Sequence, residues 1–141
     1  MNGLSAFFRE NAEKKELEID FIVSPRFLGE DGVPIAWKLR AVMPEEMEAI
    51  RKAATRTNFK DKTIDFDTEV YQKNLMAMTV IYPDLENAAL QDSYGVSTPQ
   101  ALLSAMLNGG EYNRLSLKVN ELNGGELALS QLKEQKETVK N

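Results

Sequence analysis

The chain has 141 residues, of which 43% are hydrophobic and 28% are charged, and this is the size and composition of one globular domain that buries its own core. It contains no histidine and no cysteine, which excludes histidine acid–base catalysis, Ser-His and Cys-His nucleophile pairs, and zinc sites built from these side chains. A net charge of −5 does not favour binding to nucleic acid over the whole surface, and no apolar run approaches the roughly 18 residues that cross a bilayer.

The N-terminal third predicts a short helix followed by a β-ribbon. Leu4, Phe7 and Phe8 are spaced as on one helical face, so we expect an amphipathic helix from Leu4 to about Lys15. Apolar and polar residues then alternate over 17–23 and again over 35–41, as in half-buried strands. The Asp31-Gly32 step between them indicates a chain reversal, with residues 26–28 extending the first strand.

Two helices are predicted in the middle of the chain. The first begins at Pro44, with Glu45 and Glu46 in its first turn, and ends before the polar segment 57–67. Within that segment, residues 63–66 are able to pair as a short strand. The second helix is capped by Asp67 or Thr68, continues through Tyr82 and is ended by Pro83.

Short helices separated by strong stops are predicted after Pro83. One has Asp84 as its candidate cap and ends at Gly95, and the next begins at Pro99 behind a Ser97 or Thr98 hydroxyl cap. Another covers 111–122, and a last one begins near 127 and frays over roughly the final ten residues. No linker interrupts the chain, so we expect a single domain over 1–141, of the α+β class and mainly helical, with its antiparallel β-ribbon packed on a helical array.

The string NGGE occurs twice, at 108–111 and at 123–126. Neither copy has the lysine or the preceding strand of a phosphate-binding loop, and the segments that follow the two copies are too different for an internal repeat. We interpret both copies as helix junctions. In each, Asn or Gly adopts the left-handed conformation that closes one helix, and Glu lies in the first turn of the next.

The helix pair over 97–122 also has the outline of a helix-turn-helix, so a small DNA-binding regulator is an alternative function. Two basic side chains make few phosphate contacts, and Glu111 and Glu121 oppose them, which favours an ordinary pair of packed helices. The residues that would face DNA are Asn113, Arg114, Lys118 and Asn120.

Carboxylates are the remaining candidates for chemistry, and a Mg²⁺-dependent enzyme is a further alternative. Their positions at a helix start and in a loop favour structural roles. The residues concerned are Glu45, Glu46, Glu48, Asp61, Asp65, Asp67 and Asp84. We therefore predict no catalytic residue, no metal ligand and no cofactor.

Methionines on the predicted helices indicate a different role, because their flexible side chains suit a deformable apolar surface that binds another protein. Met76, Met106 and Tyr112 on the middle and late helices are our predicted partner contacts. The same residues also fit positions in a hydrophobic core, and the sequence leaves both readings open.

Two sequence blocks resemble a known family. The most specific blocks are YPDLENAALQDSYGV and MLNGGEYNRL, and the segments PRFLGEDGVPIAWKLRAV and EEMEAIRKAATR accompany them. Together they are similar to the XkdN-like tail assembly chaperones of phages and defective prophages of Gram-positive bacteria. The resemblance covers nearly the whole chain, and we know no catalytic motif in that family.

The resemblance implies a non-enzymatic chaperone that binds the tape measure protein and keeps it soluble during tail assembly. It further implies a cytoplasmic protein of the bacterial host that is absent from the mature virion, and self-association is expected. In many phages a frameshifted longer product of this gene recruits tail tube subunits. No nucleic acid and no membrane are expected as partners.

Overall fold

The computed structural model describes residues 3–12 and 18–124, so the C-terminal segment expected to fray lies outside the described residues. The first element is a 3₁₀ helix, η1 (Gly3–Phe7). It replaces most of the amphipathic helix predicted from Leu4, and residues 13–15 of that prediction are not described. None of its side chains is buried, so the apolar stripe lacks the packing that would stabilise a longer helix.

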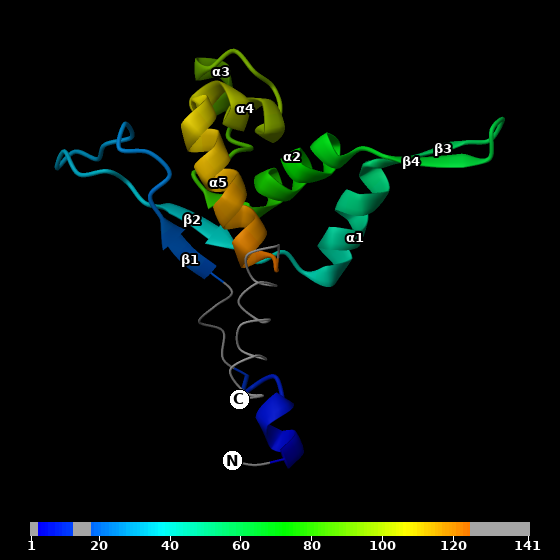
Figure 1. The fold of residues 1–141 in the computed structure, drawn as a ribbon. Coiled ribbons are helices and arrows are strands. Elements are labelled where there is room, and N and C mark those ends of the chain that lie inside the picture. Colours follow the sequence, from blue (N-terminus) through cyan, green and yellow to red (C-terminus); the bar gives the residue numbers. More distant parts are fainter. Residues whose placement is uncertain (1–2, 13–17, 125–141) are drawn as a thin grey trace, which may run out of the picture.

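A three-stranded antiparallel sheet forms from β1 (Glu18–Phe21), β2 (Trp37–Arg40) and β5 (Val80–Tyr82), with β2 in the centre. Phe21 lies opposite Trp37, which confirms the predicted ribbon. Between these strands, Gly32 has a φ of 78°, as expected for a reversal at Asp31-Gly32. The prediction that residues 26–28 extend the first strand is wrong, because β1 ends at Phe21 and the chain turns at residues 25 and 26, which leaves only an isolated Leu28–Pro34 bridge. Figure 1 shows this long connection projecting away from the helices.

The central helices are α1 (Pro44–Ala53) and α2 (Thr68–Thr79), and Asp67 caps α2 by accepting bonds from the backbone amides of Glu69 and Val70. The prediction that this helix continues through Tyr82 is wrong. The last three residues of the predicted helix leave it and form β5, which pairs with the second edge of β2. Pairing satisfies the backbone N–H and C=O groups of β5 and of β2. The spacing of apolar residues in the sequence does not reveal such pairing.

A two-stranded hairpin links α1 to α2. It consists of β3 (Thr55–Asn58) and β4 (Thr63–Phe66) and projects beyond both helices (Figure 1). The predicted strand at 63–66 is confirmed. Its partner β3 is missing from our sequence prediction, because its sequence TRTN contains no apolar residue and so shows no alternation, unlike TIDF in β4.

The second half folds into α3 (Ala88–Ser93), α4 (Pro99–Met106) and α5 (Gly109–Leu122). Thr98 caps α4 as predicted. The predicted cap Asp84 is wrong for α3, which is capped by Asn87; the Asp84 carboxylate instead accepts a bond from the Glu86 amide within the preceding turn. The helix thus begins three residues later than predicted.

The two NGGE copies behave differently. In the first, Asn108 and Glu111 form a reciprocal capping box at the start of α5, and Asn108 has a φ of −80°. The prediction of a left-handed residue there is wrong, because α4 ends in extended backbone at Leu107 and needs no reversal. In the second copy, Asn123 ends α5 and Gly124 is left-handed at φ 79°, as predicted. Glu126 lies outside the described residues.

The hydrophobic core lies where the sheet meets the helices, and it confirms the α+β class. Fully buried side chains come from elements far apart in the sequence: Trp37 and Leu39 from β2, Met76 from α2, Leu102 and Leu103 from α4, and Leu115 and Val119 from α5. Helix α2 lies between α1 on one side and α4 and α5 on the other (Figure 1). This arrangement leaves one side of α2 accessible between α1 and α4.

Candidate protein-binding groove

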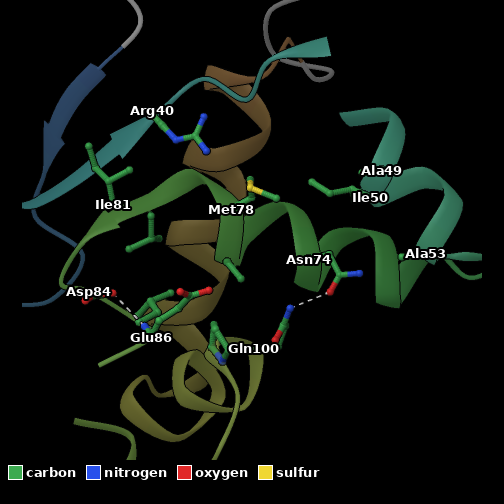
Figure 2. A pocket seen from close by; sticks show the side chains of 14 residues that line it. Arg40, Ala49, Ile50, Ala53, Asn74, Met78, Ile81, Asp84, Glu86 and Gln100 are labelled. Atoms are coloured by element: carbon green, nitrogen blue, oxygen red, sulfur yellow. Dashed lines mark hydrogen bonds between the residues drawn. The ribbon is translucent and has the colours of Figure 1, made fainter. Parts of the chain in front are cut away.

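A groove of about 510 Å³ follows α2 between α1, β5 and the start of α4 (Figure 2). Small and apolar side chains form much of its lining, and polar groups lie at its ends. The lining residues are Arg40, Ala49, Ile50, Ala53, Asn74, Ala77, Met78, Val80, Ile81, Asp84, Leu85, Glu86, Pro99 and Gln100.

The small side chains of the groove are spaced for close approach of another helix. Ala49 and Ala53 lie four residues apart on one face of α1, and Ala77 lies on the facing helix α2. Met78 and Ile81 are partly exposed beside them, with 36% of Ile81 accessible. An incoming apolar side chain therefore meets methyl groups and a flexible thioether rather than bulky rings.

The polar groups at one end of the groove are fixed by a bidentate ion pair. The Arg40 guanidinium donates to both carboxylate oxygens of Glu46 at 2.8 and 2.7 Å, and the Met43 amide donates to the same carboxylate. The hydrogen bond from Arg40 and then that from Met43 lower the pKa of Glu46 to about 2. This end of the groove is therefore charge-paired at neutral pH.

The other end is acidic. Asp84 and Glu86 lie together in the turn before α3, joined by the bond from the Glu86 amide to the Asp84 carboxylate (Figure 2). Neither carboxylate forms an ion pair with any lysine or arginine in the described part of the chain. Between the two ends, the Gln100 amide donates to Asn74 at 2.9 Å and ties α4 to α2.

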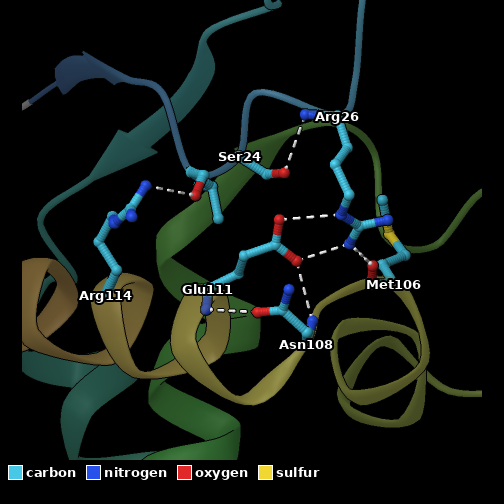
Figure 3. Close-up of polar contacts among 7 residues, drawn as sticks. Ser24, Arg26, Met106, Asn108, Glu111 and Arg114 are labelled. Carbon is cyan, nitrogen blue, oxygen red and sulfur yellow. Dashed lines mark hydrogen bonds and ion pairs between the residues drawn. The ribbon is translucent and has the colours of Figure 1, made fainter.

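A separate polar cluster holds the start of α5 to the β1–β2 connection (Figure 3). Arg26 donates through Nε to Glu111 at 3.0 Å and through Nη2 to the same carboxylate and to the Met106 carbonyl. Glu111 also accepts from the Asn108 amide, and Arg114 donates to the Val23 carbonyl. The bond from Arg26, followed by those from Asn108 and Ser24, lowers the pKa of Glu111 to about 2. Arg26, Glu111 and Arg114 each have a partner within the chain, and their bonds hold α5 to the β1–β2 connection.

The predicted partner contacts do not lie together on this groove. Met76 is fully buried and Met106 is 6% exposed, so both are core side chains, the second of the readings that the sequence left open. Tyr112 is half-buried beside a smaller hollow with Lys73 and Asn108, and burial raises the pKa of its hydroxyl. The contact of these three residues with a partner stays a prediction. Of the three, only Tyr112 has a substantial part of its side chain accessible to a partner.

The basic side chains of the supposed recognition helix face its own chain. Arg114 binds the Val23 carbonyl, and Lys118 pairs with Glu121 and lies 5.7 Å from the Phe21 ring. The structure thus gives the DNA-binding alternative no support. The candidate carboxylates are likewise separate: over the described residues, no group of three acidic side chains is placed to hold a metal ion.

Sequence reasoning missed the groove because its lining is dominated by residues without a chemical signature. The alanines at 49 and 53 were the available signal, since small residues four apart on an exposed helical face permit close helix packing. The contribution of β5 to the groove followed from strand pairing that the sequence did not predict.

These features define a small α+β protein with an apolar groove suited to a helical segment of another protein. No helix in the described ranges is long and apolar enough to cross a membrane. A family model described as "Phage XkdN-like tail assembly chaperone protein" matches residues 4–140, and the chain therefore belongs to this family of phage tail assembly chaperones.

Two relatives from Bacillus subtilis strain 168 are similar over most of their length. The phage-like element PBSX protein XkdN is 27% identical over 136 residues, covering 92% of this chain and 90% of the relative. The uncharacterized protein YqbN is 23% identical over 133 residues, covering 92% and 89%. The crystal structure of YqbN superposes with a TM-score of 0.73 at 21% identity over 89% of this chain, which supports the fold.

Proposed function

We propose that this tail assembly chaperone binds the tape measure protein and that the groove along α2 takes an apolar face of a tape measure helix. The observation that carries the proposal is the groove lined by Ala49, Ala53 and Ala77. A long helical protein exposes apolar stripes that aggregate in water, and covering such a stripe requires a shaped apolar surface and no catalytic group.

Self-association and a cytoplasmic site of action complete the proposal. The chaperone acts in the bacterial host before the tail is finished and is absent from the mature virion. A frameshifted longer product would add a segment that recruits tail tube protein. The net charge of −5 supports this role, because an acidic surface helps to keep a loaded complex in solution.

Co-expression with the tape measure protein of the same phage or prophage tests the function. We expect the soluble fraction of the tape measure protein to rise strongly when this chain is present. Equal precipitation with and without the chaperone would show that the proposed function is wrong.

A matched pair of variants tests the groove. Ala53→Trp places a large ring in the groove from an exposed position on α1, whereas Ala105→Trp adds the same ring to an exposed position of α4 that does not line it. We expect Ala53→Trp to weaken tape measure binding by about tenfold or more and Ala105→Trp to leave it unchanged. Equal binding by both variants would place the site elsewhere on the chaperone.

A further inference from the structure

The β3–β4 hairpin exposes apolar side chains that the described residues leave largely uncovered. Ile64 is 73% exposed, Phe66 47% and Phe59 at the tip 87%. In the antiparallel register Thr57 lies opposite Ile64 and Thr55 opposite Phe66, so these four side chains share one face. A two-stranded hairpin is marginally stable in water unless its apolar face is packed.

The hairpin is nevertheless well formed. Asn58 accepts bonds from the amides of Lys60 and Asp61 and donates to the Asp61 carboxylate, which fixes the turn. At the base, the Asp67 amide donates to the Ala54 carbonyl, and the Phe66 ring packs against Tyr71 with centroids 5.5 Å apart. The hairpin is thus an ordered arm anchored on α1 and α2, prepared to bind at low entropic cost.

The exposed charge at the tip of the arm is basic. Arg56 lies opposite Asp65, and Asp61, which accepts a bond from the neutral Asn58 amide, keeps its negative charge between Lys60 and Lys62, so the tip carries a net charge of +1. Lys60 and Lys62 are exposed and form no ion pair with any residue that the structure describes. The arm therefore combines an apolar face with a tip of net positive charge, on a chain whose net charge is −5.

The complementary surface lies on the β1–β2 connection, in the segment from Phe27 to Ile35, which we call the 27–35 loop. Its exposed apolar side chains are Leu28, Val33 and Ile35, at 54%, 56% and 38% exposure. Its only charged residues are Glu30 and Asp31, both exposed carboxylates at the tip. It is the acidic and apolar counterpart of the basic and apolar arm.

We propose that the arm of one copy docks on the 27–35 loop of a second copy, with Ile64 against the apolar residues of the loop and Lys60 and Lys62 facing Glu30 and Asp31. The two surfaces project in opposite directions from the body of the protein (Figure 1), so the arm of a chain cannot reach the 27–35 loop of the same chain. The contact is head-to-tail and leads to a ring or a filament, and the groove along α2 stays open to the tape measure protein. This inference rests on the proposed self-association and names its surfaces.

Charge exchange between the two surfaces tests the pairing. One variant carries Lys60→Glu and Lys62→Glu in the arm; the other carries Glu30→Lys and Asp31→Asn in the loop, where Asn keeps the oxygen that accepts the Val33 amide bond. Lys52→Glu, at a 78% exposed side chain of α1, is the control. Sedimentation velocity over a range of concentrations measures assembly, and circular dichroism checks folding.

We expect the wild type and the control to assemble alike, and each charge variant alone to assemble about tenfold more weakly. A mixture of the two charge variants should recover assembly, because each acidic arm then meets a basic loop and each basic arm an acidic one. Assembly by both charge variants at wild-type concentrations, or no recovery in the mixture, would overturn the arm–loop pairing while self-association stands. A wild type that stays monomeric at all concentrations would overturn both.

Discussion

At the scale of single residues, Glu111 joins three segments: it completes the capping box of α5, pairs with Arg26 of the β1–β2 connection, and accepts a bond from the Asn108 amide at the α4–α5 junction. Its pKa is about 2 in the folded chain and near 4.5 when it is unperturbed. A depressed folded pKa stabilises the fold above the unfolded value, and that stabilisation is lost as the pH falls from about 4.5 towards 2.

We therefore predict that Glu111→Gln lowers the unfolding temperature at pH 7 and that its difference from the wild type shrinks as the pH falls through this range. Thermal unfolding at pH 7, 4.5, 3 and 2 measures it. Glu10→Gln, at an exposed position outside the α-helices and strands, serves as the control for the loss of a carboxylate and should unfold like the wild type. A difference between Glu111→Gln and the wild type that does not change with pH would contradict the assignment of the low pKa to Glu111.

A second residue, Asn123, ties together three parts of the chain. Its amide donates to the Thr79 hydroxyl at 3.0 Å and to the Val119 carbonyl, and its oxygen accepts from the Val42 amide at 2.8 Å. Thr79 is fully buried. We predict that Asn123→Ala lowers the free energy of unfolding by about 1–3 kcal/mol, because it leaves buried polar groups without partners. Urea unfolding measures this, and the exposed Asn113→Ala should change the value by less than about 0.5 kcal/mol.

At the scale of elements, the two NGGE copies predict opposite responses to the same substitution. Gly109 is in the first turn of α5 with open space at its Cβ position, whereas Gly124 is left-handed at φ 79°. We expect Gly109→Ala to stabilise the protein by about 0.4–1 kcal/mol through the unfolded chain, and Gly124→Ala to destabilise it by about 1–2 kcal/mol. Chemical denaturation measures the change in the free energy of unfolding for both variants. Changes of the same sign would contradict the distinction between helix start and helix end.

How far the sequence predicts the elements depends on whether local or tertiary interactions decide them. Caps such as Asp67 and Thr98 are local and were predicted, as was the ribbon, whose alternation reflects burial on one face. Val80–Tyr82 carries the apolar spacing of the preceding helix, and only its pairing with β2 makes it a strand. Thr55–Asn58 contains no apolar residue, so no alternation marks it, and only its pairing with Thr63–Phe66 makes it a strand.

The site was less predictable than the fold. Met76 and Met106 satisfy the pattern of a deformable surface and of a core equally, and only the packing of α2 against α4 and α5 places them inside. The groove depends on alanines whose importance comes from what lies opposite them. Its outline therefore requires the relative positions of α1, α2 and α4, which no local pattern of residues contains.

At the scale of the whole molecule, the surfaces assigned here are separate. The groove lies beside α2. The arm extends from the C-terminal end of α1 and the N-terminal end of α2, and the 27–35 loop extends from the sheet (Figure 1). Helices α1 and α2 form the groove and also carry the arm. The proposed sites for a second copy of the chain and for a tape measure helix therefore lie on the same packed pair of helices. Binding at either surface depends on the integrity of the same core.

This shared core predicts that the sheet and the helices unfold together. Trp37, the single tryptophan, is 2% exposed in β2 and reports on the sheet, whereas far-ultraviolet circular dichroism reports mainly on the helices. We predict coincident urea transitions by the two probes. Leu115→Ala in α5, at a fully buried position, should shift both transitions equally and cost about 2–5 kcal/mol, although the substitution lies far from the tryptophan in sequence. If the fluorescence transition stayed in place while the circular dichroism moved, the ribbon would be a separate folding unit, and the arm and loop would not be held by a common body.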